Sequence, residues 1–426
     1  MPMTTNKEKA GARLVEATRA LVPLLREQAA AMDREGRPTR VVLEALNDAL
    51  LYRIDIPEEF RGLDGVRIPD RVKAMYELGR GNGSVGWGVI QNNSLVRYLR
   101  AQTRLDERAL RELFELDHAG PLACGAFYNL DHALGIGEKV DGGMSVYGSW
   151  SFSSNIRITA FMLQGMTWQE GDKSIRGFAL IPRQEAEVAD DWRVTGLMAS
   201  NSNTAFIRRD KSVFVPEYRT MPVFDEDFLE GAEEYPYDSI ALELAGMAIG
   251  MASAAYELFV DKVTRRAPWG MPYELIRDMP TVQVLAARAR AAIDVALGRL
   301  LQNSETIELG GKETPPDVIA SADFEAIWLS HQMRDIVDQL RQVIGSSTLA
   351  VDDAIGRYAR DIDALCLHVT FRRDWVDETR GRELLGAQMH GEVSMSTSKV
   401  QHAPLEPTNV IDEDEYTGQR VELGAI

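Results

Sequence analysis

Three stretches with different hydrophobic patterns follow one another along this chain, and their order restricts the fold more than any single motif does. The first and third stretches place apolar residues every three or four positions, which is the period of amphipathic helices. The middle stretch has short alternating or β-branched runs separated by glycine-containing turns, which is typical of strands. Neither a repeated βαβ pattern nor a plain series of strands explains this order.

The helical pattern is longest in the third stretch, where it covers roughly 239–266, 278–306, 318–346 and 351–370. Segments of this length are typical of a four-helix bundle. Small residues around Gly246 and Gly250 predict that the first of these helices packs closely on a neighbour. We therefore expect an α+β fold, mostly α, with an N-terminal helical domain (1–119), a central β-barrel or β-sandwich domain (120–232), a C-terminal four-helix bundle (233–388) and a C-terminal tail (389–426).

Composition argues against several partners and compartments. In 426 residues, 65 Asp and Glu outnumber 47 Lys and Arg, for a formal net charge of -18. Nucleic acid and anionic membrane need a basic face, so we expect neither as a partner. We see no run of about 18 apolar residues that would cross a membrane. The two cysteines lie among apolar residues and the N-terminus lacks a signal-type core, which together predict a cytoplasmic protein.

Two patterns that often mark cofactor or metal sites are incomplete in this sequence. The run Gly81–Gly86 has the glycine spacing of a dinucleotide-binding loop, but it follows a helical stretch instead of a strand. We expect a helix break there. The six histidines form no His-x-x-x-His pair and no cluster with cysteine, so no metal site is predicted.

Several segments in the right order resemble one family. Gly148–Asn155 is similar to the Gly-x-Trp-x-Phe-x-Ser-Gly motif of the flavin-dependent monooxygenase branch of the acyl-CoA dehydrogenase fold. The segment 196–203 resembles that family's Gly-Leu-x-x-Thr-Gly-Ser-Asn run, and Arg360-Asp361 followed by His368 resembles its Arg-Asp-x-x-x-x-x-x-His signature. The likeness covers about residues 15–385 and includes further similar runs at 56–63, 83–87 and 215–216.

This resemblance implies the oxygenase component of a two-component, group D flavin-dependent monooxygenase. The implied cofactor is reduced FMN or FAD, with O₂ as co-substrate and a separate NAD(P)H:flavin reductase as partner. The implied reaction is hydroxylation of an aromatic or heteroaromatic small molecule through a flavin C4a-hydroperoxide, in a homo-oligomer that is a tetramer or a dimer. The alternatives are N- or S-oxygenation of an amine, amino sugar or sulfur heterocycle, an acyl-CoA dehydrogenase-like flavin oxidase, and a helical scaffold that has lost flavin.

Two features depart from the family pattern. Asn155 and Asn201 stand where glycine or threonine is usual, which affects the expected geometry of the loops near the flavin. The Tyr-Glu-Gly-Thr run that carries the catalytic base of true acyl-CoA dehydrogenases is missing. Its absence favours oxygenation over dehydrogenation.

The resemblance also assigns roles to individual residues. Ser154 would lie beside flavin N5, where its hydroxyl can donate or accept a hydrogen bond. Arg265, near the end of a helix, would meet the flavin phosphate of a neighbouring subunit. The residues expected to contact the flavin are Phe127, Trp150, Ser153, Ser154, Ser202, Asn203, Arg265, Gln283, Ser346 and Ser347.

His368 is the second predicted catalytic residue, because an imidazole titrating near neutral pH can take a phenolic proton or interact with the distal peroxide oxygen. The substrate pocket is expected to be amphipathic and without an obvious clamp for anions. Its expected lining is Trp87, Asn92, Asn93, Tyr128 and His368.

Overall fold

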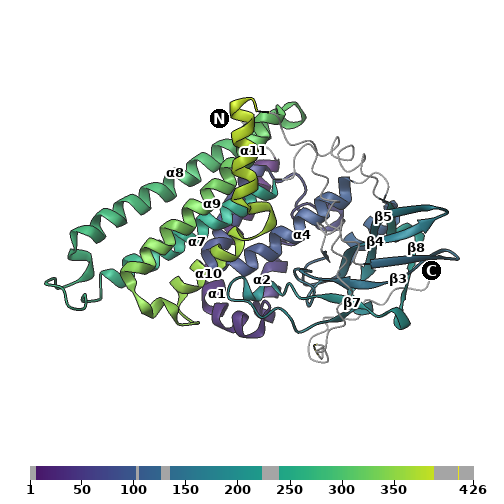
Figure 1. Cartoon of the computed structure of the whole chain (residues 1–426), viewed down its shortest axis with the longest axis horizontal. Helices are drawn as coiled ribbons and strands as arrows, with labels where there is room; N and C mark the ends of the chain where they lie inside the picture. The colour runs from purple at the N-terminus through teal and green to yellow at the C-terminus, as the bar shows by residue number, and fades with distance from the viewer. Residues whose placement is uncertain (1–5, 102–104, 126–134, 223–238, 388–410, 412–426) are drawn as a thin grey trace.

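A helical body and a β lobe make up the protein (Figure 1). The computed structural model describes residues 6–101, 105–125, 135–222, 239–387 and 411. The first helices are α1 (Asn6–Glu35), α2 (Arg40–Asp48), α3 (Ile68–Gly81), α4 (Gly83–Ala101) and α5 (Glu107–Phe114). After the β lobe come α7 (Ile240–Val263), α8 (Pro280–Gly310), α9 (Pro316–Ile344), α10 (Ala354–Cys366) and α11 (Arg373–Leu385).

The glycine-rich run at the end of α3 breaks the helix, as expected from the sequence. Asn82 is extended, with φ -162° and ψ 125°, and so separates α3 from α4. Its side-chain Oδ1 accepts a hydrogen bond from the backbone N of Val85 at 3.1 Å, which satisfies one of the free amides at the start of α4.

The N-terminal and C-terminal helices share one hydrophobic core. Leu25 of α1, Met75 of α3, Ile249 of α7, Ile293 of α8 and Ile362 of α10 all have 0% exposure and belong to the same buried cluster. Helices that are far apart in sequence are therefore stabilised by the same burial of apolar surface. Although the sequence divides into separate helical stretches, the described helices form a single body.

The β lobe is one mixed sheet. Its strands are β1 (Ala123–Cys124), β2 (Gly135–Val140), β3 (Gly143–Trp150), β4 (Phe161–Glu170), β5 (Lys173–Pro182), β6 (Glu187–Val188), β7 (Ala205–Ile207), β8 (Val213–Pro216) and β9 (Thr220–Pro222). The order across the sheet is β6-β7-β3-β2-β4-β5-β9, with β1 beside β4 and β8 beside β3. The end of β3 and the segment before β7 thus lie next to each other, because Trp150 pairs with Ala205.

Helix α7 is the central helix of the helical body. By length and composition alone, this helix is apolar enough to cross a membrane. The sequence predicted no such segment, because the helix contains no uninterrupted apolar run of about 18 residues. However, 78% of the apolar 18-residue stretch within this helix is buried inside the protein. The apolar character of α7 therefore serves the shared core.

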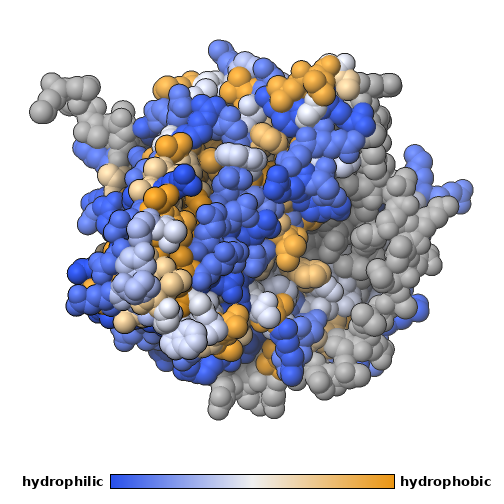
Figure 2. Space-filling model, turned by 60° about the vertical axis from the view of Figure 1, so that its left-hand side comes forward, coloured by the Kyte–Doolittle hydropathy of each residue, from blue (hydrophilic) through white to orange (hydrophobic). Residues whose placement is uncertain are grey.

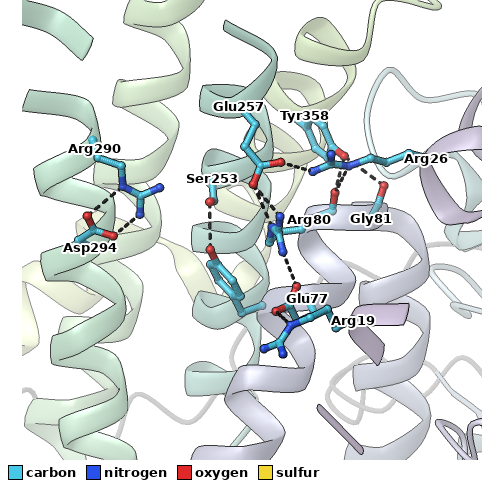
Figure 3. A network of polar contacts seen from close by, with 11 residues as sticks. Arg19, Arg26, Glu77, Arg80, Gly81, Ser253, Glu257, Arg290, Asp294 and Tyr358 are labelled. Atoms are coloured by element: carbon cyan, nitrogen blue, oxygen red, sulfur yellow. Dashed lines mark hydrogen bonds and ion pairs between the residues drawn. The ribbon is translucent and has the colours of Figure 1, made fainter. Parts of the chain in front are cut away.

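Polar contacts also join α7 to α1 and α3, and α10 to α3 (Figure 3). Glu257 of α7 accepts from Arg80 of α3 at 2.7 Å and from Arg26 of α1 at 2.8 Å. The hydroxyl of Tyr358 on α10 donates to the backbone carbonyl of Arg80 at 2.7 Å. Because these groups are only partly exposed, each needs its partner to offset lost hydration.

Glycines allow α3 and α7 to approach closely, as the small residues of α7 predict. A Cβ added at Gly250 would lie 2.0 Å from the carbonyl oxygen of Tyr76, and one added at Gly246 would lie 2.8 Å from that of Val72. Both neighbours are backbone atoms of α3, so the whole helix would have to move. The helix pair therefore depends on the lack of a side chain at these positions.

We expect Gly250→Ala to lower the free energy of unfolding by roughly 1–3 kcal/mol or more, because it overpacks a helix contact. Gly298→Ala is the matched control, because Gly298 lies within α8 and an added Cβ meets nothing within 4 Å. That variant should gain about 0.5–1 kcal/mol from helix propensity. Urea unfolding measures both, and equal effects of the two substitutions would contradict the packing argument.

Candidate active site

The loop after β3 and the loop before β7 each contain an asparagine with a left-handed backbone. Asn155 has φ 70° and Asn201, in the loop before β7, has φ 40°. Asparagine tolerates this region better than most residues with a side chain. Asn155 Nδ2 donates to the Gly88 carbonyl at 2.8 Å, and Asn201 Oδ1 accepts from Arg157 N at 3.0 Å. The two departures from the family motif therefore keep a glycine-like backbone and add bonds that hold it.

Hydroxyl groups from these two loops meet an indole from α4. Trp87 Nε1 donates to Ser154 Oγ at 2.9 Å. Ser154 Oγ lies 2.9 Å from Ser202 Oγ, and Ser202 Oγ lies 2.8 Å from Ser200 Oγ. The sequence predicted Ser154, Ser202 and Trp87 as site residues but missed Ser200, although hydroxyls at 200 and 202 flank Asn201.

His368 lies against the same indole. The ring centroids of His368 and Trp87 are 5.0 Å apart, in an edge-to-face arrangement of 70°. The residue was expected on a helix, but it follows the end of α10 and begins the short turn Val369–Phe371. One side chain, Trp87, thus contacts both predicted catalytic residues, which come from separate stretches of the chain.

Burial governs the protonation of His368. It lowers the pKa of the imidazole to about 4, so the ring is neutral at neutral pH. The backbone N of Thr370 donates to Nδ1 at 3.4 Å. With Nδ1 accepting, the neutral ring carries its proton on Nε2. His368 therefore offers a hydrogen-bond donor from Nε2, whereas the sequence suggested a residue that takes a proton.

Arg360 and Asp361 attach the 195–203 loop to α10. Asp361 Oδ1 accepts from Leu197 N at 2.7 Å, and Arg360 Nε donates to the Thr195 carbonyl at 3.0 Å. A Cβ at Gly196 would lie 2.0 Å from the Arg360 carbonyl oxygen, so glycine is needed at this contact. In the sequence these two residues were recognised only as part of a signature, and the structure shows that they hold the loop in place.

Three other residues predicted to contact the flavin donate hydrogen bonds to backbone carbonyls. Trp150 is 1% exposed and donates from Nε1 to the Gly165 carbonyl at 2.8 Å, so it packs in the β core. Ser153 is 0% exposed and its Oγ donates to the Trp150 carbonyl at 3.0 Å. Asn203 Nδ2 donates to the Ala189 carbonyl at 2.9 Å. These side chains support the loops, and their polar atoms do not join the hydroxyl chain.

The paired amides Asn92 and Asn93, expected to line the substrate pocket, instead hold backbone. Asn92 Oδ1 accepts from Leu122 N at 2.8 Å, and its Nδ2 donates to the Tyr52 carbonyl at 2.9 Å. Asn93 Nδ2 donates to the Leu51 carbonyl at 2.8 Å. Both residues are at most 1% exposed. Their hydrogen-bonding groups are already used in these contacts, and the substrate role given to them stays a prediction.

A second group of predicted flavin contacts lies at one end of the helical body. Arg265, Gln283, Ser346 and Ser347 are all exposed. They come from the end of α7, the start of α8 and the turn after α9, and Arg266 Nη1 donates to Ser347 Oγ at 3.4 Å. Because this group is exposed, it suits contact with a second chain. Phe127 and Tyr128, the remaining two, lie outside the described residues.

The chemistry of the buried group fits a flavin ring. A flavin edge presents nitrogen and oxygen atoms that need neutral donors and acceptors, and the buried chain supplies hydroxyls of both kinds. Of the three hydroxyl residues, Ser154 is the most accessible at 7%. The exposed Arg265 guanidinium suits a phosphate.

Comparisons with known proteins agree with this arrangement. Residues 242–373 match the family described as acyl-CoA dehydrogenase, C-terminal domain. The chain is 27% identical over 383 residues to the flavin-dependent monooxygenase oxygenase subunit HsaA of Mycobacterium tuberculosis, covering 86% of this chain and 93% of that one. It is 25% identical over 405 residues to the oxygenase component of the FADH(2)-dependent resorcinol hydroxylase of Rhizobium sp., covering 89% and 96%.

Solved structures share the fold. XiaF from Streptomyces sp., in complex with FADH2 and glycerol, superposes with a TM-score of 0.77 at 21% identity over 90% of this chain and 97% of that one. The 3-HSA hydroxylase from Rhodococcus sp. RHA1 gives a TM-score of 0.73 at 22% identity over 89% and 98%.

Over most of its length the chain is similar to oxygenase subunits of flavin-dependent monooxygenases, and it has the acyl-CoA dehydrogenase-like fold of the solved structures. The predicted fold and function class are thereby confirmed. The roles of individual site residues stay predictions.

The partly buried imidazole of His368 should titrate near pH 4. In NMR spectra of the folded protein, the ring signals of His368 are expected to keep the neutral, Nε2-protonated form down to about pH 5. The folded pKa lies below the unfolded value of about 6.5. Stability is therefore lost as the pH falls from about 6.5 towards 4. His368→Gln should remove these signals and part of that loss, and a midpoint near 6.5 would contradict the proposed burial.

Proposed function

We propose that this chain is the oxygenase component of a two-component monooxygenase that hydroxylates an aromatic or heteroaromatic small molecule. The observation that carries the proposal is that Trp87 contacts both Ser154 and His368 at the meeting point of helical body and β lobe. The chain would use reduced FMN or FAD, supplied by a separate NAD(P)H:flavin reductase, together with O₂. Its relatives include a resorcinol hydroxylase and a p-hydroxyphenylacetate 3-hydroxylase, whose names describe aromatic substrates.

The reaction needs both electrons and a dry pocket. Reduced flavin, when bound, supplies the electrons that activate O₂. Ser154 would hold the flavin edge through its hydroxyl. His368 would donate from Nε2 to an oxygen of the substrate and so fix the position of the ring that is attacked. Trp87, 6% exposed, would exclude water between the two.

We further propose a homo-oligomer, a tetramer or dimer, in the cytoplasm. The exposed group at Arg265 would reach the flavin of a neighbouring chain. Apolar side chains are exposed among hydrophilic ones on the helical body (Figure 2), and Trp328, Trp375 and Leu385 are 42%, 52% and 85% exposed. Large exposed apolar side chains favour association where they form a contiguous patch. Two buried free thiols, Cys124 and Cys366, suit a reducing compartment.

Removing the His368 side chain should separate flavin oxidation from product formation. We expect His368→Ala to bind flavin and consume O₂ but to form product about 100-fold more slowly, with H₂O₂ released instead. His368→Gln keeps a donor near the position of Nε2 and should recover part of the product. The measurement is the ratio of product to H₂O₂ with a flavin reductase, NADH and a panel of phenols, amines and sulfur heterocycles.

The matched control is His118→Gln, because His118 is a partly buried histidine whose Nε2 bonds only a backbone carbonyl, that of Ile158, at 2.9 Å. Coupling should be unchanged in that variant. Wild-type coupling in His368→Ala would remove the role of His368. Product from an amine or sulfur compound alone would replace aromatic hydroxylation by N- or S-oxygenation.

Arg265→Ala should weaken flavin binding about tenfold or more without changing the oligomer, because a charged hydrogen bond to phosphate is lost. Arg265 is 75% exposed and is paired with Asp261 at 2.6 Å. Arg299→Ala is the control, since Arg299 is another exposed arginine paired with a carboxylate, Glu325 at 2.6 Å. Flavin titration and size-exclusion chromatography test both variants. A flavin-competent monomer would contradict the shared site.

A further inference from the structure

The hydroxyl chain at the centre of the site has one fixed end. Trp87 Nε1 lies 2.9 Å from Ser154 Oγ. An indole nitrogen donates and cannot accept, so Ser154 always accepts from Trp87. Each serine hydroxyl has one proton and two lone pairs, and nothing in the geometry fixes which of two neighbouring oxygens is the donor. The protons of the chain can therefore be ordered in two ways.

In the first order, Ser154 donates to Ser202, and Ser202 donates to Ser200. Ser154 then accepts from Trp87 and keeps one lone pair for an incoming donor. In the second order, Ser200 donates to Ser202, and Ser202 donates to Ser154. Ser154 then accepts twice, and its own proton is free for an incoming acceptor. The same hydroxyl thus changes from acceptor to donor by rotation of three O–H bonds.

We propose that the Ser154–Ser202–Ser200 chain is a reversible hydrogen-bond relay that matches Ser154 to the redox state of the flavin. This inference rests on the proposed function. Flavin N5 carries a hydrogen in the reduced form and a lone pair in the oxidised form, so the two forms require opposite roles from a hydroxyl beside it. Ser202 and Ser200 act through Ser154 and are positioning residues.

Because the relay is buried, the loss of any one of its hydroxyls changes how the others can pair. Ser200 and Ser202 are 1% and 4% exposed, so bulk water does not replace a missing hydroxyl. Without the Ser202 oxygen, the proton of Ser154 has no acceptor in the first order, but it still reaches the ligand in the second. A buried donor left unpaired costs more than a bond that is simply absent. Loss of Ser202 should therefore penalise the reduced flavin more than the oxidised flavin.

The experiment measures dissociation constants for oxidised and reduced FMN and FAD under anaerobic conditions. For Ser202→Ala we expect affinity for reduced flavin to fall about tenfold relative to oxidised flavin, which lowers the midpoint potential of bound flavin by about 30 mV. Ser200→Ala should shift the ratio in the same direction by less. Trp87→Phe should weaken both forms alike, because the indole donates identically in both orders.

Two further variants control for folding and for loss of any hydroxyl. Ser202→Thr keeps the hydroxyl and should retain the wild-type affinity ratio. Ser145→Ala removes one member of an exposed serine pair, in which Ser145 Oγ of β3 lies 2.7 Å from Oγ of Ser212, the residue before β8, and should leave both affinities unchanged. If Ser202→Ala weakens both flavin forms equally, the relay is overturned while the proposed function stands. If the wild-type protein binds neither form, the proposed function fails first.

Discussion

The site depends on one face of helix α4. Residues three and four positions apart lie on the same side of a helix, and Ser84, Trp87 and Gly88 have this spacing. This face makes hydrogen bonds from Ala199 N to Ser84 Oγ at 3.2 Å, from Trp87 Nε1 to Ser154 Oγ at 2.9 Å and from Asn155 Nδ2 to the Gly88 carbonyl at 2.8 Å. Two loops of the β lobe are thereby held at fixed positions on a helix of the shared core. A Cβ at Gly88 would lie 2.6 Å from Asn155 Oδ1, so a side chain there would displace the Asn155 amide that bonds this helix.

Helix α10 holds the same loop from the other side. Asp361 is 2% exposed, and burial raises the pKa of its carboxyl to about 7 although Leu197 N donates to it. Leu197 has φ 50°, a left-handed conformation that is costly for a large side chain and needs such support. His368 follows Asp361 by seven residues, just beyond the end of α10. The position of the imidazole and that of the serine loop are consequently set by the same helix.

The sequence predicted the fold because its signals are local. Apolar periodicity placed the long helices within a few residues of α7 to α10, and the glycine-rich run Gly81–Gly86 marked the break between α3 and α4. It also named Trp87, Ser154, Ser202 and His368, which the structure brings into contact in one line. Those residues lie in recognisable motifs, so position in the motif was enough.

The contacts of other predicted site residues could not be read from the sequence, because hydrogen-bond partners depend on tertiary structure. Asn92 and Asn93 suggested a polar pocket, but their amides bind backbone from residues about 30 to 40 positions away. Trp150 suggested a flavin cover, but its indole binds a carbonyl across the sheet. Residue type shows that a side chain can donate; it does not show whether the fold already provides an acceptor.

The polar side chains that meet at Trp87 are uncharged, which suits a ligand whose redox states differ in where they carry protons. Trp87, Ser154 and Ser202 are neutral, and His368 is neutral because its pKa is low. A buried charge would favour one ligand form and would require a partner of its own. Hydroxyls can reverse donor and acceptor roles without moving heavy atoms. The charged groups expected to act on the ligand, such as Arg265, are on the surface, where a phosphate can remain hydrated while the ring is enclosed.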